Sequence, residues 1–300
     1  MKDSSRKNNL VNLFIVGAPK CASTTIYNYL GSHPSVFMSH PKELNYFSKE
    51  EIQRQELYYH APIVKDMKDY EKLFKRADEY KIVGEGSVSY FIYEDVPGKI
   101  AEYNQDARII IVLRNPVARS YSHYLMDRRL GYVKNKSFDL IFRNPKRFPN
   151  YFQQYFSMSK YSIPVNRYIE AFGRHRVKVI LEDDIAAHHV SWQRELCDFL
   201  DLDHFITDLP LVSNSFKEPK NYFFSFLYQS ALVRDMVRFI VPQFFARSLK
   251  KFVFSYKEKP VLDFEITSAL YSFFRDDVLK LEKTLQRDLS SWLGKDVQND

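Results

Sequence analysis

The chain has 300 residues, 45% of them hydrophobic, and a net charge of +7, which is enough apolar material for one large α/β domain. No apolar run approaches the length of a membrane span, and the first nine residues are polar, unlike a signal peptide. With eight glycines and no linker-like stretch, the sequence predicts a polar tail over residues 1–9 and a single domain over residues 10–293. The basic excess does not require nucleic acid, because sites for small anions are basic too and no nucleic-acid-binding motif accompanies it.

The first predicted element is a β-strand that leads into a phosphate-binding loop. A β-rich run over residues 10–16 ends at Gly17, and Lys20 follows in a short loop. Three hydroxyl residues, Ser23 to Thr25, then open a helix with apolar periodicity. Backbone N–H groups and the positive end of the helix dipole would face one point there, and Lys20 adds a full charge. This segment predicts a site for a nucleotide phosphate or a similar anion.

A second phosphate element is predicted after a later strand. Residues 107–113 form a short apolar, β-branched run typical of a buried parallel strand, and Arg114 follows it. Pro116 suits the first turn of a helix, which places Ser122 about two turns into it. Ligands of open α/β sheets collect at the carboxyl ends of the strands, and an arginine fork with a hydroxyl suits a terminal phosphate.

Together the two elements resemble the PAPS-dependent sulfotransferases, whose donor is 3′-phosphoadenosine 5′-phosphosulfate (PAPS). A Walker A loop places its lysine directly before Ser or Thr, whereas Lys20 comes early, as in the P-K-x-G-T-T loop of that family. Arg114 and Ser122 match the pair that holds the donor's 3′-phosphate, with the same separation of eight residues. The resemblance implies that the 5′-phosphosulfate is bound by Lys20, Cys21, Ala22, Ser23 and Thr24.

The strand pattern and the resemblance imply an α/β fold of the P-loop-like, three-layer kind, with a central, mostly parallel β-sheet flanked by helices. Strands are expected near residues 11–17, 35–38, 81–84, 108–113 and 177–181. The segment from Asp276 to Trp292 resembles the closing helix of the family.

A third motif lies between the two phosphate elements. Lys42, Glu43, Tyr46 and Phe47 match the K-E-x-x-F-F stretch of the heparan-sulfate-type branch, with one Phe replaced by Tyr. The resemblance implies that Glu43 is the catalytic base that removes the proton of the acceptor, and that Lys20 neutralises charge on the leaving oxygen. Lys42 and Tyr46 are candidate acceptor-binding residues. The rival bases His40 and His60 are expected to be exposed and unspecialised.

Residues 85–91 depart from the family. Glycan-sulfating relatives have E-K-[ST]-P-x-Y-F, with a lysine that contacts acceptor or sulfate, where this chain has Gly86 and Val88. The departure weakens an acidic polysaccharide as acceptor and suggests that the space at Gly86, with Tyr90, serves another acceptor.

Two further segments are assigned to the donor by resemblance. Tyr161, in an S-x-Y motif, is expected near the nucleotide. Lys217 and Lys220 lie where relatives carry a basic loop that closes over the donor, although a plain surface loop is almost as good an interpretation. The aromatic-rich region 222–254 is open to interpretation as a lid, an interface or core.

The sequence therefore predicts a transferase that moves a sulfuryl group from PAPS to a hydroxyl or amine of a small-molecule or carbohydrate acceptor and releases adenosine 3′,5′-bisphosphate (PAP), without a metal. Two alternatives stay open: a P-loop kinase or NTPase, which would require Mg²⁺ and ATP, and a non-catalytic nucleotide-binding protein. The two cysteines are expected to be reduced thiols in a cytoplasmic protein, which would be a monomer or a homodimer without nucleic-acid partners.

Overall fold

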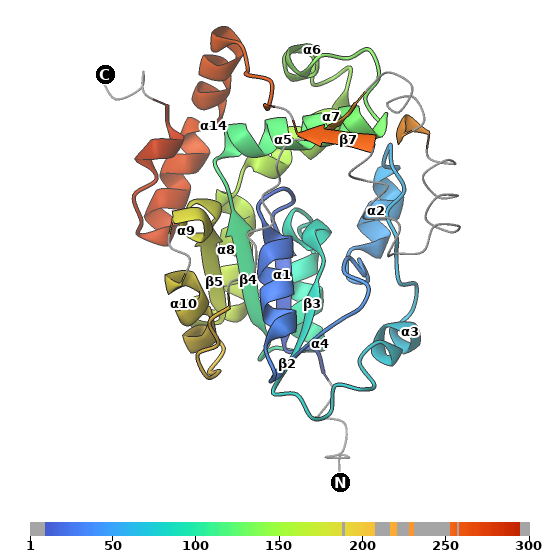
Figure 1. Cartoon of the computed structure of the whole chain (residues 1–300), viewed down its shortest axis with the longest axis vertical. Helices are drawn as coiled ribbons and strands as arrows, with labels where there is room; N and C mark the ends of the chain where they lie inside the picture. Colours follow the sequence, from blue (N-terminus) through green and yellow to red (C-terminus); the bar gives the residue numbers. More distant parts are fainter. Residues whose placement is uncertain are drawn as a thin grey trace.

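A five-stranded parallel β-sheet forms the centre of the molecule (Figure 1). The computed structural model describes residues 10–187, 190–207, 217–220, 228–230, 253–256 and 258–294. The strand order is β2-β3-β1-β4-β5. Their bounds are Leu13–Gly17 for β1, Val36–Met38 for β2, Ile82–Gly86 for β3, Arg108–Leu113 for β4 and Val177–Leu181 for β5. All five strands lie where the sequence predicted them, and the α/β fold is confirmed.

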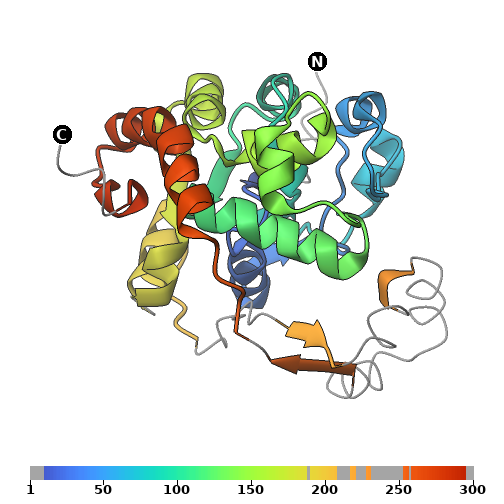
Figure 2. The ribbon, with the colours of Figure 1, turned by 90° about the horizontal axis from the view of Figure 1, so that it is seen from above.

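Both faces of the sheet are covered by helices, which explains why its strands are apolar throughout. Every residue of β1 is buried, as are the last five of β4. Helix α1 (Ser23–Ser32) and helix α10 (Ser191–Phe199) cover one face, and their side chains meet where Tyr29 packs edge-on against Trp192. Helices α4 (Val96–Tyr103) and α8 (Ser162–Phe172) cover the opposite face (Figure 2).

Helix α5 (Pro116–Leu130) crosses the edge at which the strands end (Figure 1). It begins at Pro116 as predicted, and the side chain of Asn115 caps it by accepting hydrogen bonds from the N–H groups of Val117 and Ala118. Helices α7 (Pro149–Tyr155) and α14 (Phe264–Leu285) contact α5. The carboxyl ends of the strands therefore face α5 and the loops around it.

The remaining elements surround this frame. The predicted closing helix over residues 276–292 begins earlier, because Asp263 caps α14 at Phe264, and it ends at Leu285. Further α-helices in the described part of the chain are α2 (Lys49–Gln55), α3 (Met67–Lys72), α6 (Phe138–Arg143) and α9 (Glu182–Ala187). A two-stranded antiparallel pair is formed by β6 (Lys217–Pro219) and β7 (Phe254–Tyr256).

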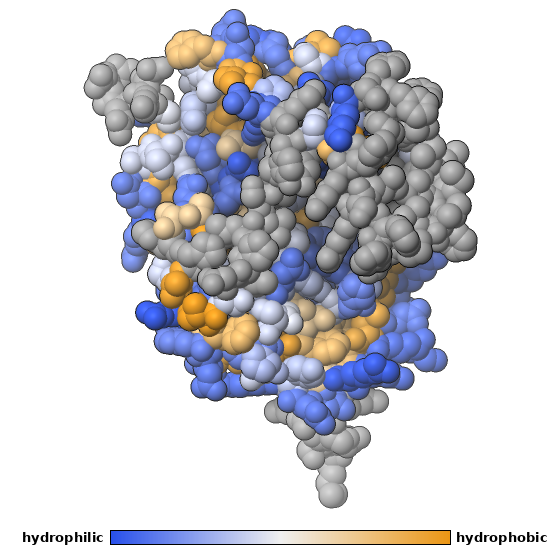
Figure 3. Space-filling view, in the orientation of Figure 1, coloured by the Kyte–Doolittle hydropathy of each residue, from blue (hydrophilic) through white to orange (hydrophobic). Residues whose placement is uncertain are grey.

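Some predictions fall on residues outside the described part. The tail 1–9 and most of the aromatic-rich region 222–254 belong to this group, so their roles stay predictions. Within the described residues, no helix is both long and apolar enough to cross a bilayer. On the face drawn in Figure 3, apolar side chains lie in a band bordered by hydrophilic ones.

Candidate active site

The predicted phosphate loop occupies residues 18–22, between β1 and α1. Lys20 and Ala22 have φ values of 69° and 61°, so the backbone turns sharply before α1 begins at Ser23. No side chain caps this end of α1, which leaves its first-turn N–H groups for a ligand. Ser23 is buried and Thr24 is exposed. The loop has the form of an anion cradle.

Lys20 carries the central charge of this cradle. Burial lowers its pKa to about 8, with further lowering by the positive charges of Arg129, Arg119 and Arg114, while Asp127 opposes the shift. Its Nζ lies 3.6 Å from the sulfur of Met126 on α5. Positive charge crowded in this way favours a ligand with several negative charges.

Arg114 stands at the end of β4, and its side chain faces the same region as Lys20. Its Nε forms an ion pair with Glu182 of α9 at 2.7 Å, and burial raises the pKa of that carboxyl group although Arg114 opposes the shift. Ser122 lies half-buried on α5, two turns after Pro116. The two phosphate elements predicted from sequence thus meet at one edge of the sheet.

Tyr161 contacts both the phosphate loop and Arg114. Its fully buried hydroxyl donates to the carbonyl oxygen of Arg114 at 2.9 Å and lies 3.9 Å from Sγ of Cys21 in the phosphate loop. Burial raises the pKa of the Cys21 thiol to about 12, so the thiol stays protonated. Both Cys21 and Cys197 are free thiols, as predicted. With this placement, Tyr161 positions the loop and Arg114 relative to each other.

Arg119 also binds the phosphate loop, and it was not identified from the sequence. Its side chain is fully buried, and its Nε donates to the carbonyl oxygen of Pro19 at 2.9 Å. Its remaining donors are used by the carbonyl groups of Gln154 and Tyr155, Ser159 Oγ and His123 Nδ1. The sequence did place Arg119 just after Pro116, near the start of the predicted helix, and this position was the only indication of its role.

Lys259 is a second cation that sequence reasoning missed. Its pKa is lowered to about 8, mainly by burial and then by the positive charge of Arg114. Lys20 lowers it further, whereas the carboxylate of Glu182 opposes the shift. Its Nζ lies 4.9 Å from the centre of the Tyr121 ring on α5. The basic loop of the donor was predicted at Lys217 and Lys220, whereas the structure brings Lys259 to Arg114.

Of the two lysines predicted for that loop, the structure describes the side chain of one. The side chain of Lys217 lies outside the described part of the structure. Lys220 is exposed, and its backbone N–H donates to the carbonyl of Val253 beside β7. The signal for Lys259 in the sequence was the K-E-K-P run that ends at Pro260.

Glu43 lies at the same sheet edge, on the connection that follows β2. Its N–H donates to the carbonyl of Gly86 at 2.8 Å, which ties it to the end of β3. One carboxylate oxygen pairs with Lys42, and the other accepts from the N–H of Val88 at 2.9 Å. Its side chain is 31% exposed, so a reacting group can approach. His40 and His60, the rival bases, are exposed.

A buried carboxylate network holds the segment that carries Glu43. Glu85, fully buried on β3, accepts hydrogen bonds from the hydroxyls of Tyr70, Ser87 and Tyr90 at 2.7, 2.6 and 2.8 Å. Ser87 Oγ in turn accepts from the N–H of Asn45. Tyr90, a predicted acceptor contact, therefore lies in the core and presents no surface to a ligand.

Two other predicted acceptor residues are placed differently from the expectation. A Cβ added at Gly86 would lie 2.8 Å from the ring of Tyr27 and 3.5 Å from Cε of Lys42, so the chain's own side chains fill the space that glycine leaves. Tyr46 packs against Tyr70, and Lys49 stacks on its ring. Tyr46 also lines a cavity of about 370 Å³ beside α2 and α4, together with residues such as Lys49 and Lys99.

The chain belongs to the sulfotransferase domain family, whose model matches residues 11–229. It is similar to the bifunctional heparan sulfate N-deacetylase/N-sulfotransferase 1 of Caenorhabditis briggsae, with 24% identity over 217 residues, 67% of this chain and 24% of that protein. It is also similar to the mouse heparan sulfate glucosamine 3-O-sulfotransferase 3A1, with 29% identity over 115 residues, 38% of this chain and 26% of that protein. The chain thus spans about a quarter of the length of these curated relatives.

Among solved structures, a sulfotransferase from Alicyclobacillus acidocaldarius superposes with a TM-score of 0.67 and 26% sequence identity, covering 94% of this chain and 98% of that one. The similarity to this bacterial protein extends over almost the full length of both chains.

Proposed function

We propose that the protein transfers a sulfuryl group from PAPS to a hydroxyl or amine of a small-molecule or carbohydrate acceptor and releases PAP. The family assignment supports the reaction class. The single observation that supports PAPS as the donor is the cation cluster at the sheet edge, where the charge of Arg114 adds to burial in lowering the pKa of both Lys20 and Lys259. A donor with a phosphosulfate at one end and a 3′-phosphate at the other would neutralise such a cluster.

In this proposal the phosphate loop binds the 5′ end of the donor. Lys20 and the first-turn N–H groups of α1 would stabilise negative charge on the leaving phosphate oxygen as the S–O bond breaks. Arg114, Ser122 and Lys259 would hold the 3′-phosphate and so align the donor for attack. Tyr161 and Arg119 keep these parts in register through the carbonyls of Arg114 and Pro19.

Glu43 is the proposed base, and the acceptor would enter from its side. The carboxylate is held by Lys42 and the Val88 N–H, which fixes its orientation at the end of β3. It would take the proton of the acceptor as the acceptor oxygen or nitrogen bonds to sulfur. Lys42 lies beside Gly86 and would supply a positive charge near the acceptor.

The cellular setting is part of the same proposal. The two free, buried thiols suit a reducing compartment, which supports a cytoplasmic location. The proposed oligomeric state is a monomer or a homodimer. A single domain over residues 10–293 is retained as a prediction.

The test combines binding and transfer. Calorimetry with PAP and with ATP plus Mg²⁺ should show binding of PAP alone, and sulfur-35 from labelled PAPS should appear in an acceptor when pools of glycans and small hydroxyl compounds are screened. The Lys20→Ala variant is the negative control. Binding of ATP in preference to PAP would support a kinase or NTPase instead, and PAP binding without transfer to any pool would support a non-catalytic nucleotide-binding protein.

A further inference from the structure

A row of buried polar side chains runs along α5 beneath Lys20. Arg119, His123 and Asp127 follow one another at intervals of four residues, so they share one face of the helix. Arg119 Nη2 lies 2.9 Å from His123 Nδ1, and His123 Nε2 lies 3.9 Å from Asp127 Oδ2. Because a guanidinium only donates, His123 Nδ1 must be the acceptor, which places the proton of the neutral ring on Nε2, toward Asp127. The row begins at the phosphate loop, where Arg119 Nε binds the carbonyl of Pro19.

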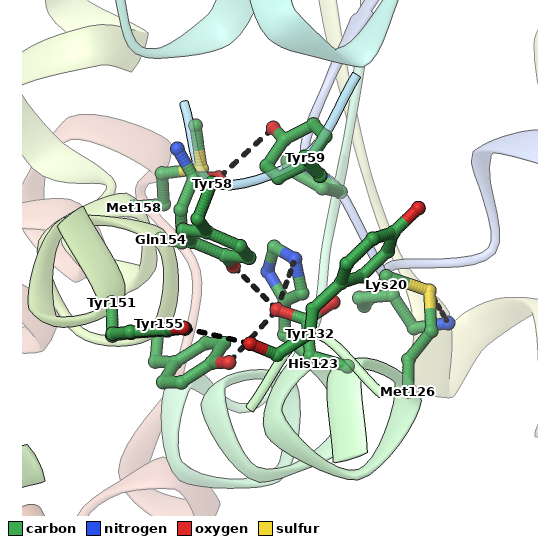
Figure 4. Close-up of polar contacts among 12 residues, drawn as sticks. Lys20, Tyr58, Tyr59, His123, Met126, Tyr132, Tyr151, Gln154, Tyr155 and Met158 are labelled. Carbon is green, nitrogen blue, oxygen red and sulfur yellow. Dashed lines mark hydrogen bonds and ion pairs between the residues drawn. The ribbon is translucent and has the colours of Figure 1, made fainter. Parts of the chain in front are cut away.

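Asp127 ends this row and is itself held by two tyrosines. Its side chain is almost fully buried, and Oδ2 accepts hydrogen bonds from the hydroxyls of Tyr58 and Tyr155, the second at 2.8 Å. Tyr155 belongs to α7, and Tyr58 comes from the connection between α2 and α3, so three parts of the chain converge on one carboxylate. Figure 4 shows the two tyrosines in the same region as His123, Met126 and Lys20. The residue before Asp127, Met126, is the one that Lys20 contacts.

Without the carboxylate of Asp127, positive charges would outnumber negative ones around Lys20. Arg119 and Arg129 on α5, Arg114 at the end of β4 and Lys259 on the segment before α14 all add positive charge near it. His123 does not change this sum, because burial and the charges of Arg119 and Lys20 hold its pKa well below the usual range and keep the ring neutral. On the acidic side stand Asp127 and Glu182, and Glu182 is already paired with Arg114.

We infer that Asp127 is a positioning residue whose carboxylate, fixed by Tyr58 and Tyr155, supplies the negative charge that offsets the cations crowding Lys20 and so keeps Lys20 charged for its work at the phosphate loop. The inference rests on the proposed role of Lys20 in sulfuryl transfer. Burial raises the pKa of Asp127 to about 6 against the opposing effect of the two tyrosine hydroxyls, so its carboxylate is ionised at neutral pH. Between the pKa of Asp127 near 6 and that of Lys20 near 8, the two groups carry opposite charges.

The direct test is the titration of Lys20 itself, which requires neither donor nor acceptor. Competitive labelling with acetic anhydride between pH 6 and 10, read by mass spectrometry on the peptide that contains Lys20, gives the pH at which this amine loses its proton. In Asp127→Asn this midpoint should fall, by up to about one pH unit, because the variant removes an opposite charge from a partly buried site in which Asp127 raises the pKa of Lys20. Asp127→Glu, which keeps the charge, should restore it toward the wild-type value.

Two tyrosine variants serve as a matched pair that leaves Asp127 in place. Tyr58→Phe removes a hydroxyl that favours the ionised carboxylate, so labelling of Lys20 at pH 7 should become faster. Tyr151→Phe is the control, because Tyr151 stacks on Tyr58 at 4.4 Å but donates its own hydroxyl to the carbonyl of Tyr132.

An unchanged midpoint in a folded Asp127→Asn protein would overturn the inference. If that variant does not fold, equal labelling rates in Tyr58→Phe and Tyr151→Phe would overturn it instead. A shifted Lys20 midpoint in a protein that transfers no sulfuryl group from PAPS would refute the proposed function and leave the role of Asp127 standing. Where transfer is measured, the fall of kcat/KM at alkaline pH should begin at lower pH in Asp127→Asn than in the wild type.

Discussion

At the scale of single residues, the site depends on how burial changes the chemistry of ordinary side chains. Lys20 loses proton affinity because it is partly buried among arginines, and Glu43 is oriented by Lys42 and a backbone N–H. Arg114 is already paired with Glu182. Each of these contacts implies a measurable consequence.

The pKa of Lys20 predicts the alkaline limit of the reaction. Since its pKa is lowered to about 8, the charged form that the reaction needs is present below that pH and is lost as the pH rises through it. We expect kcat/KM for PAPS to fall above about pH 8, because this ratio reports the groups of the free enzyme. Lys20→Arg should make this limb shallower, since a guanidinium stays charged, and should leave the part that belongs to Lys259, whose pKa is also lowered to about 8. Lys20→Ala should lower turnover by about 10² to 10³ below about pH 8. A limb that is unchanged in the arginine variant would assign it to a group other than Lys20.

Glu43→Gln keeps the shape of the side chain and removes its ability to accept a proton. Turnover should fall by about 10² to 10⁴, the usual contribution of a general base, while the affinity for PAP stays unchanged. The measurement is initial-rate sulfuryl transfer alongside calorimetry. Glu94→Gln is a suitable control, because Glu94 is exposed and pairs with Arg167. Undiminished turnover in the Glu43 variant would remove this residue from its role.

Arg114 and Glu182 should act in opposite directions on donor affinity. Arg114→Ala removes a charged hydrogen-bonding group and should weaken PAP binding by about 10- to 100-fold. Glu182→Gln removes the carboxylate that competes for Arg114 and should tighten binding. Arg108→Ala, at the other end of β4 and paired with Asp201, is the matched control in calorimetry. Equal PAP affinity in Arg114→Ala and Arg108→Ala would count against the 3′-phosphate assignment.

At the scale of elements, the loop 18–22 owes its shape to helices that lie far from it in the sequence. Arg119 of α5 binds the carbonyl of Pro19, and Tyr161, the residue before α8, contacts Cys21. The loop is therefore held between α5 and α8 rather than by local turn chemistry alone. This explains how two residues in the left-handed region, Lys20 and Ala22, are maintained.

Tyr161→Phe tests this support. Loss of the buried hydroxyl leaves the carbonyl of Arg114 without its 2.9 Å donor, which should lower the free energy of unfolding by about 1–3 kcal/mol and also weaken PAP binding. Tyr168→Phe, on the helix that follows Tyr161, is a close match, because its hydroxyl is equally buried and donates to the carbonyl of Tyr90 at 2.9 Å. That variant should lose stability alone. Equal PAP affinity in the two variants would show that Tyr161 has no part in positioning the site.

The strands and the phosphate loop were predictable because their signals are local. β1 and β4 are short apolar runs, each followed by a residue that marks the site, Lys20 or Arg114. Arg119 and Lys259 were not found because their roles depend on which distant groups they meet, such as the carbonyl of Pro19 or the charge of Arg114. The partners of a buried polar side chain cannot be read from the periodicity of the sequence around it.

The same reason explains the acceptor residues that were expected and are placed elsewhere. Gly86 suggested free space, but Tyr27 on α1 fills it, and the motif around residue 86 gives no indication of that neighbour. Tyr90 was grouped with the site by its motif, whereas its hydroxyl belongs to the buried Glu85 network. Proximity in a motif does not determine the direction in which a side chain points.

At the scale of the whole molecule, the Glu85 network ties the site to the stability of the fold. The carboxyl is fully buried on β3, and its three hydroxyl donors come from α3, from the residue after β3 and from the short helix that follows, so the segment carrying Glu43 is built on it. Burial raises its pKa from 4.5 to about 7, the hydroxyl donors opposing the shift. The folded protein therefore holds a proton on Glu85 under conditions in which the unfolded chain has released it.

This shift predicts how stability changes with pH. A raised folded-state pKa contributes stability that is complete below about pH 4.5 and is lost as the pH rises to about 7. Over that interval the contribution amounts to about 3 kcal/mol. Glu85→Gln has no such titration, so its free energy of unfolding relative to the wild type should rise by this amount between pH 4.5 and 7.5, as measured by urea denaturation. Comparing the two proteins cancels the other acidic groups that they share. Glu265→Gln, which alters an exposed partner of Arg143, should show no rise, and a parallel pair of curves for Glu85→Gln and the wild type would mean that Glu85 is ionised within the fold at neutral pH.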